Sequence, residues 1–119
     1  MASTHFHIER LRELLQREIG TVISQELRDP RIPHVVTVTQ VKLAQDTRNA
    51  TIYVSILGDN NEKNNAVAAL NKAASFIQRT VAGRITVKHF PHLYFKIDNT
   101  LEHSQHINEI LKEIQDDLE

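Results

Sequence analysis

The chain of 119 residues, 40% hydrophobic and 24% charged, has the size and composition of one globular domain spanning 1–119. It contains no cysteine, which excludes a disulfide framework and a thiolate metal site and fits a reducing cytoplasm. No apolar run reaches membrane-spanning length and no signal-peptide pattern is present, so we expect a cytoplasmic protein without a membrane partner.

The formal net charge of −1 is unevenly distributed along the chain. Residues 99–119 contain six of the 15 acidic residues and a single base, Lys112. Residues 1–98 therefore hold 13 bases and 9 acids, a net charge of +4. This body is only mildly basic, so any nucleic-acid binding must depend on where the charges are placed.

The first half of the chain predicts a helix followed by two strands. Apolar residues at helical spacing predict a helix over about 5–27, which must end before Pro30 because the residue preceding proline disfavours the α region. The segments "VVTVTQVKL" and "ATIYVSIL" are typical of strands, and their short polar connection predicts an antiparallel pair. The apolar positions of the first strand change face after Val38, which a bulge near Gln40 would reconcile.

The second half predicts helix, strand and helix. After "GDNNEKNN", which supplies turn and N-cap residues, apolar residues at steps of three and four from Val67 to Val81 predict one long helix. "HLYFKI" alternates as a third strand, and a last helix is expected over about 99–117 with an acidic face. The order of elements indicates an α+β domain with its helices on one face of the sheet.

Seven histidines raise the alternative of a histidine-dependent metal-binding protein or enzyme. Six of them form close pairs: His5 with His7, His89 with His92, and His103 with His106. No carboxylate is placed as a third ligand and Pro91 interrupts the middle pair, so surface histidines are the favoured interpretation. No phosphate-binding glycine loop or nucleophile motif is present, so we expect neither an enzyme nor a cofactor.

One side of the long predicted helix carries small residues between two cations. Ala68, Lys72, Ser75 and Arg79 follow one another at steps of four, three and four. Small residues would let a phosphodiester chain approach the helix while the cations flank it. A solvated helix face would show the same pattern.

Five fragments resemble a known family when taken in order. "RDPRI", "VTVTQVKLAQD", "ATIYVSILG", "LNKAASFIQ" and "FPHLYFKID", within about 10–115, are similar to the bacterial ribosome-binding factor A family. The resemblance implies a type II KH-like domain (α-β-β-α-kink-α-β) with a three-stranded sheet, a core over about 5–98 and a C-terminal helix. It also implies a monomeric, non-catalytic, cytoplasmic assembly factor for the small (30S) ribosomal subunit. Such a factor supports late processing of the 16S rRNA 5′ end and growth in the cold, and a ribosome-maturation GTPase is expected to release it.

The resemblance also suggests where RNA would bind. The kink of the family, an Ala-x-Gly sequence, falls on Ala73, Ala74 and Ser75, and serine can bend a helix by bonding to a preceding carbonyl. Lys88 keeps the charge that usually precedes P-x-L-x-F but lacks the bidentate fork of arginine. The residues expected to contact RNA are Arg28, Arg31, Lys72, Ser75, Arg79, Arg84 and Lys88.

In the loop "RDPRIP", Asp29 is expected to pair with a neighbouring arginine, and the flanking prolines are expected to present Arg31 to an anion at a low entropic cost. A further alternative is a protein-interaction domain that uses the acidic C-terminal helix.

Overall fold

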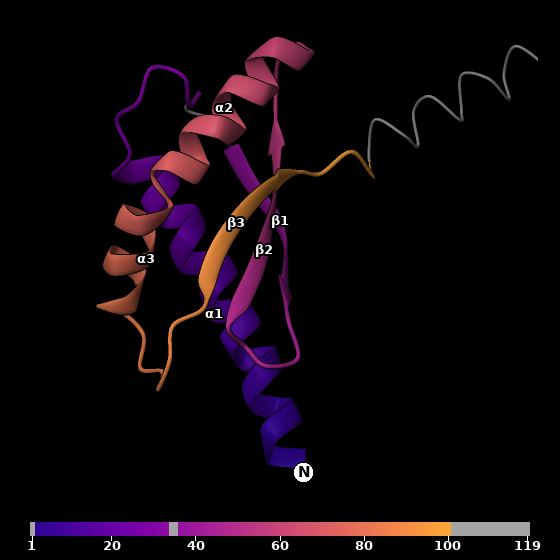
Figure 1. Cartoon of the computed structure of the whole chain (residues 1–119), viewed down its shortest axis with the longest axis vertical. Coiled ribbons are helices and arrows are strands. Elements are labelled where there is room, and N and C mark those ends of the chain that lie inside the picture. Colours follow the sequence, from indigo (N-terminus) through magenta and orange to yellow (C-terminus); the bar gives the residue numbers. More distant parts are fainter. Residues whose placement is uncertain (1, 34–35, 101–119) are drawn as a thin grey trace, which may run out of the picture.

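The computed structural model describes residues 2–33 and 36–100 as a layer of helices packed on one side of a sheet (Figure 1). The elements are α1 (Ala2–Gln25), β1 (Val36–Leu43), β2 (Asn49–Ile56), α2 (Asn60–Lys72), α3 (Ala74–Ala82) and β3 (His92–Ile97). This order confirms the predicted α+β fold with helices on one face. Most of the predicted C-terminal helix, from residue 101 on, lies outside the described residues.

The sheet has the order β1-β2-β3, which makes β3 an edge strand. The pairing of β1 with β2 is antiparallel, as predicted, whereas β2 and β3 run parallel. The register of β1 shifts between Val38 and Gln40, which confirms the predicted bulge. Because of this extra residue, both Val38 and Val41 face the core.

The bulge also ties the first strand to the end of the third. The Thr39 hydroxyl oxygen (Oγ1) lies 2.6 Å from Asp98 Oδ2 and 3.3 Å from the carbonyl oxygen of Tyr53 on the intervening strand. The backbone N–H of Thr100 donates to Asp98 Oδ1 at 2.9 Å. Hydrogen bonds from Thr100 and Thr39 lower the pKa of Asp98, so this carboxylate stays ionised and engaged within the domain.

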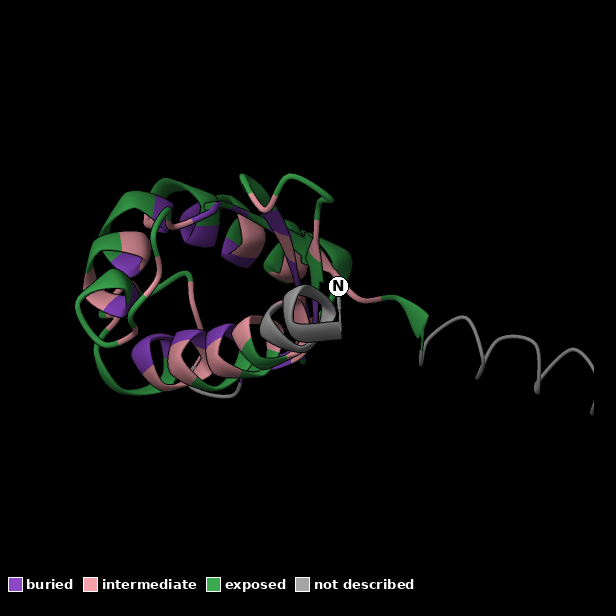
Figure 2. Ribbon diagram, turned by 90° about the horizontal axis from the view of Figure 1, so that it is seen from below, coloured by how far each residue is buried: buried purple, intermediate pink, exposed green. Residues whose placement is uncertain are grey.

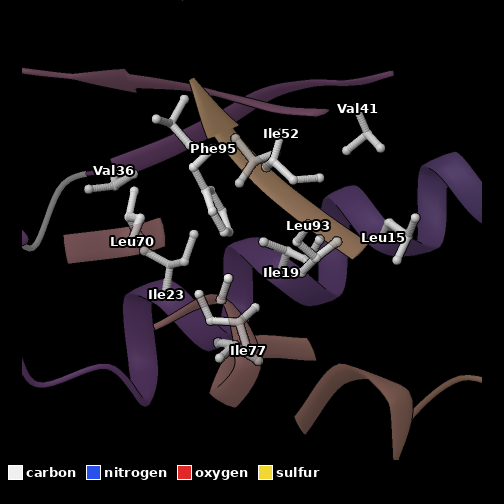
Figure 3. Close-up of a cluster of buried hydrophobic side chains, with 14 of the residues drawn as sticks. Leu15, Ile19, Ile23, Val36, Val41, Ile52, Leu70, Ile77, Leu93 and Phe95 are labelled. Carbon is white, nitrogen blue, oxygen red and sulfur yellow. The ribbon is translucent and has the colours of Figure 1, made fainter. Parts of the chain in front are cut away.

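The core fills the space between the helices and the sheet. In Figure 2 the buried positions of the helices turn towards the interior of the domain. Figure 3 shows side chains from every layer meeting there. The largest completely buried aliphatic side chains are Leu15 and Ile19 on α1, Ile52 on β2, Leu70 on α2, Ile77 on α3 and Leu93 on β3. None of the helices within residues 2–33 and 36–100 is long and apolar enough to cross a membrane.

The predicted single long helix is in fact two helices. Ala73 separates α2 from α3 with φ −86° and ψ 1°, a conformation outside the α-helical range. Both helices pack against β3 (Figure 1), and α3 also packs against α1. The apolar spacing predicted one helix because the step of four residues continues across the break. Leu70 and Ala74, on either side of Ala73, both face the core.

The start of α2 follows from the sequence that precedes it. Asp59 is the N-cap, and its side chain accepts a hydrogen bond from the Glu62 backbone N–H at 2.8 Å. The Glu62 carboxylate accepts in return from the Asp59 N–H at 3.3 Å, which completes a capping box. The N-cap prediction for this loop is therefore confirmed.

Candidate nucleic-acid interface

The predicted cationic stripe remains on one surface across the helix break. Lys72 lies in the last turn of α2, Ser75 in the first turn of α3 and Arg79 in its last turn, and all three are exposed. The opposite sides of the same two helices are buried in the core. We call Lys72, Ser75 and Arg79 the kink stripe.

The kink stripe belongs to a long segment without acidic residues. Residues 63–97 contain no aspartate or glutamate. They contain six basic residues: Lys63, Lys72, Arg79, Arg84, Lys88 and Lys96. This segment builds most of α2 and all of α3 and β3, so the helix break and the neighbouring edge of the sheet share a positive field. The acid-free stretch is visible in the sequence, and our sequence-based reasoning overlooked it.

The kink does not arise from a hydrogen bond of Ser75, which corrects that expectation. Within the described residues the Ser75 hydroxyl forms no hydrogen bond, and the departure from helical geometry occurs two residues earlier, at Ala73. Backbone bonds continue on both sides, from Ala73 N–H to the Ala69 carbonyl and from Ile77 N–H to the Ala73 carbonyl, each at 3.0 Å. The small, exposed Ser75 thus leaves its hydroxyl available to a ligand.

A groove runs between the helix break and the edge strand. It has a volume of about 380 Å³, and its walls are formed by Asn71, Ala74 and Ser75 on one side and by residues 92–96 of β3 on the other. Asn71 fixes the separation of these walls: its side-chain amide donates to the Phe95 carbonyl at 3.1 Å, and its Oδ1 accepts from the Phe95 N–H at 2.9 Å. These two bonds satisfy backbone groups on the free edge of the sheet. Asn71 and Phe95 are 24 positions apart in the sequence, so local sequence patterns did not reveal that Asn71 binds the sheet edge.

The loop after α1 lies close enough to Lys72, the first residue of the kink stripe, for the charge of that lysine to act on Asp29. Arg31 is held by Asp29, with Nε 3.1 Å from Oδ1 and Nη2 2.8 Å from Oδ2, and its backbone N–H also donates to Oδ1 at 2.9 Å. The pairing of Asp29 with a neighbouring arginine is therefore confirmed. The charge of Arg31 is already partly compensated, whereas Arg28 is exposed and forms no ion pair with any described residue.

The Asp29–Arg31 pair gives a pH-dependent prediction. The side-chain and backbone hydrogen bonds from Arg31 lower the pKa of Asp29 from 3.8 to about 2, and the charge of Lys72 lowers it further by a smaller amount. A carboxyl group whose pKa is lowered in the folded state stabilises the fold above its unfolded-state value, and this contribution is lost as the pH falls from about 4 through 2. We expect an NMR titration of the Asp29 carboxyl carbon to give a midpoint near pH 2 and Arg31→Ala to move it back towards 3.8. An unchanged midpoint in the variant would contradict this pairing.

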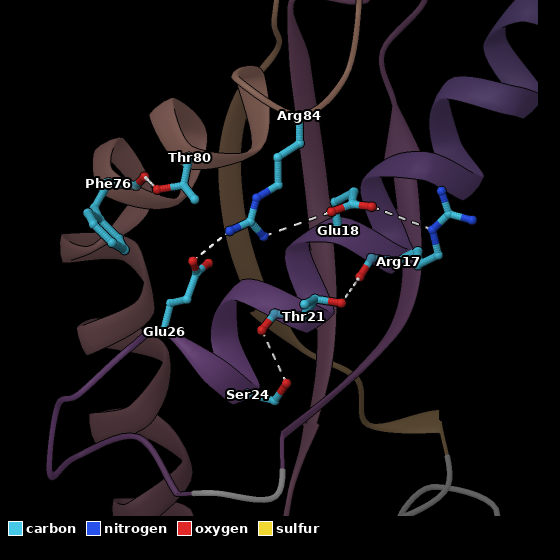
Figure 4. A network of polar contacts seen from close by, with 8 residues as sticks. All are labelled: Arg17, Glu18, Thr21, Ser24, Glu26, Phe76, Thr80 and Arg84. Atoms are coloured by element: carbon cyan, nitrogen blue, oxygen red, sulfur yellow. Dashed lines mark hydrogen bonds and ion pairs between the residues drawn. The ribbon is translucent and has the colours of Figure 1, made fainter.

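Arg84 connects the end of α3 to α1 (Figure 4). Its Nη2 lies 2.5 Å from Glu26 Oε1 and its Nη1 lies 3.9 Å from Glu18 Oε2. Glu18 in turn lies 3.6 Å from Arg17 Nε. Arg84 is therefore engaged in holding two helices together, and its positive charge is offset by two carboxylates, unlike the charges of the kink stripe.

Lys88 lies in the loop before β3, away from the helix break along the chain. It is exposed and lines a hollow of about 610 Å³ together with Arg10, His89 and apolar residues of α1 and of its own loop. The structure thus brings Lys72, Ser75 and Arg79 together, with the Arg28–Arg31 loop beside Lys72. It places Arg84 in an ion-pair network and Lys88 beside a separate hollow.

The described residues contain no cluster of side chains that would support the metal-binding alternative. Among the described residues no group of three or more histidine, cysteine, aspartate or glutamate side chains is arranged to hold a metal ion. His103 and His106 lie outside the described residues, as does the acidic face of the predicted C-terminal helix.

Comparisons with known proteins agree on one family. Residues 7–111 match the family model described as ribosome-binding factor A. The chain is 43% identical over 106 residues to ribosome-binding factor A of Thermomicrobium roseum, covering 89% of this chain and 81% of that protein. It is 41% identical over 110 residues to the protein of the same description from Desulfitobacterium hafniense, covering 92% and 87%.

Known structures that resemble this chain carry the same family description. The crystal structure of ribosome-binding factor A from Thermus thermophilus superposes with a TM-score of 0.67 at 28% identity, covering 75% of this chain and 92% of that one. A homology model of the Thermus thermophilus factor, fitted into an electron cryomicroscopy map of a 30S–RbfA complex, gives a TM-score of 0.58 at 27% identity, covering 71% and 88%. The family model, the sequence relatives and the shared fold agree over most of the chain, which therefore belongs to the ribosome-binding factor A family.

Proposed function

We propose that this chain binds the immature small ribosomal subunit through 16S rRNA and acts as an assembly factor. In this proposal it supports late processing of the 16S rRNA 5′ end and matters most in the cold. The observation that carries the proposal is the exposed kink stripe within a segment free of acidic residues, in a member of the ribosome-binding factor A family. The fitted Thermus thermophilus relative supports the choice of the 30S subunit as partner.

The proposed mechanism is binding without cleavage. Lys72 and Arg79 flank Ser75, so a phosphodiester chain can approach the helix break closely while the two cations neutralise neighbouring phosphates. Arg28 extends this footprint from the adjacent loop. Contacts of this kind carry little sequence information, so specificity would come from the shape of folded rRNA.

The remaining parts of the proposal follow from the same role. The protein acts as a monomeric single domain over residues 1–119 in the cytoplasm, and a ribosome-maturation GTPase drives its release. Arg31, Arg84 and Lys88 contribute less to affinity than the kink stripe. Arg31 and Arg84 already form ion pairs, and Lys88 lies beside a different hollow.

Sedimentation through a sucrose gradient tests the proposal. We expect the protein to migrate with small subunits from cold-grown cells and to dissociate as salt is raised. For about four phosphate contacts, affinity should fall roughly 50-fold between 50 and 200 mM salt because condensed counterions are released on binding. Absence from the small-subunit fraction, or binding that does not respond to salt, would overturn it.

A further inference from the structure

The side of the sheet that faces away from the helices is not covered by any helix of residues 2–33 and 36–100 (Figure 1). Alternate residues of each strand point to this side, because the others face the core. We call this surface the open sheet face. Its residues are exposed or half-buried: Thr37, Gln40, Lys42, Asn49, Thr51, Tyr53, Ser55, His92, Tyr94 and Lys96.

The strand register places aromatic rings and cations side by side on the open sheet face. Lys42 of β1 pairs with Thr51 of β2, which pairs with Tyr94 of β3. In the next row Tyr53 of the central strand pairs with Lys96 of β3. Neighbouring strands are about 4.8 Å apart and these rows are about 6.7 Å apart. Two rings therefore lie on adjacent rows, with one lysine in each row.

The open sheet face is positively charged and polar. None of the three strands contains an aspartate or glutamate. Asp98, just after β3, stays ionised and accepts hydrogen bonds from Thr39 and Thr100, so its single negative charge offsets only part of the positive charge of Lys42 and Lys96. None of the ten described residues that form this face is aliphatic, so the face does not match the apolar side of an amphipathic helix.

The rings of Tyr94 and His92 are exposed, and that of Tyr53 is half-buried. Tyr94 is 47% exposed, and the centroid of its ring lies 4.7 Å from that of His92, with the planes inclined at 58°. Unpaired bases stack on accessible aromatic side chains, whereas the bases of a duplex are already stacked on one another. Lysines beside the rings can neutralise the backbone phosphates of the same strand.

The open sheet face is continuous with the kink stripe. The groove between the helix break and β3 has Ser75 on one wall and Tyr94 and Lys96 on the other. No carboxylate lines this groove, so an RNA chain held at Lys72 and Ser75 can cross the edge strand there.

We propose that the open sheet face is a second RNA-binding surface, which takes a short single-stranded segment by stacking bases on Tyr94 and Tyr53 and holding phosphates with Lys42 and Lys96. The choice of RNA as the ligand rests on the function proposed above. The surface itself is separate from the kink stripe and is tested with RNA alone.

The chain provides its own reporter for this test. It contains no tryptophan and only two tyrosines, Tyr53 and Tyr94, and both lie on the open sheet face. Titrating the full chain with single-stranded octaadenylate should quench tyrosine emission, and a duplex of the same length should quench it much less. Labelled octaadenylate in an anisotropy assay should bind Tyr94→Ala about tenfold more weakly or worse, because one stacking partner is lost.

Matched variants separate this proposal from the proposed ribosome binding. Phe76→Ala removes an exposed aromatic ring of α3, 42% exposed, and should bind octaadenylate as the wild type does. Lys72→Glu with Arg79→Glu should no longer bind small ribosomal subunits, but octaadenylate should still quench its tyrosine emission.

Lys42→Glu with Lys96→Glu provides a second variant of the open sheet face if Tyr94→Ala fails to fold. Unchanged tyrosine emission on saturation with RNA, or wild-type affinity in folded Tyr94→Ala, would overturn the second surface and leave the kink-stripe proposal standing.

Discussion

Lys72→Glu combined with Arg79→Glu is expected to abolish co-sedimentation with small ribosomal subunits while leaving the fold intact. Both side chains are exposed at the ends of the kink stripe and form no ion pair with a described residue. A hydrogen bond to a charged group contributes about 1.5–3 kcal/mol, so losing two phosphate contacts weakens binding by roughly 100-fold or more. Reversal of charge adds repulsion from the phosphates. Sedimentation in a sucrose gradient measures the loss, and circular dichroism verifies the fold.

The matched control is Arg12→Glu with Arg17→Glu on α1. It changes the net charge by the same amount but alters residues that pair with Glu9 and Glu18, outside the kink stripe. We expect this control to retain most of its binding. Equal loss in both double variants would mean that net charge, and not the kink stripe, determines the association. Wild-type binding by folded Lys72→Glu/Arg79→Glu would place the RNA contact on another surface.

Ile77→Ala is expected to lower the free energy of unfolding by about 2–5 kcal/mol. The Ile77 side chain is completely buried where α3 meets the core (Figure 3), and truncation leaves a cavity that its neighbours fill only partly. For a domain of this size the melting temperature should fall by about 10 °C or more. Urea unfolding followed by circular dichroism gives the change in free energy.

The adjacent residue on α3 supplies the control. Phe76 has the larger side chain but is 42% exposed, so Phe76→Ala should cost less than Ile77→Ala despite removing more atoms. A greater loss of stability in Phe76→Ala would show that α3 is rotated relative to the packing described here. A loss below about 1 kcal/mol in Ile77→Ala would contradict the buried position of that side chain.

Local patterns predicted most of the fold. Side-chain direction alternates in strands and repeats every 3.6 residues in helices, so apolar spacing alone identified the buried positions of β2, α3 and β3. The bulge near Gln40 was predictable because a strand whose apolar residues change face needs one extra residue to bury both halves. The helix break at Ala73 was not predictable from spacing, since both helices continue the same apolar stripe, and only the resemblance suggested it.

The candidate site was predicted less completely. Lys72, Ser75 and Arg79 share a surface as expected, because residues at steps of three and four lie on one side even across a one-residue break. Arg84 was also expected to be available to RNA, but it pairs with Glu26, 58 positions away along the chain. The role of Asn71 at the sheet edge and the two tyrosine-bearing rows of the open sheet face depend on strand order, which no local pattern contains.

The sequence by itself therefore determined the strands, the helical regions, their buried sides and the cap that starts α2, though not the break at Ala73, because each of these depends on residues only a few positions apart. The tertiary structure alone decided which cations are already paired, that β3 runs parallel to β2, and that Tyr53, Tyr94, Lys42 and Lys96 gather on one face. Those features arise from contacts between distant segments, and such contacts form only where the hydrophobic core brings the segments together.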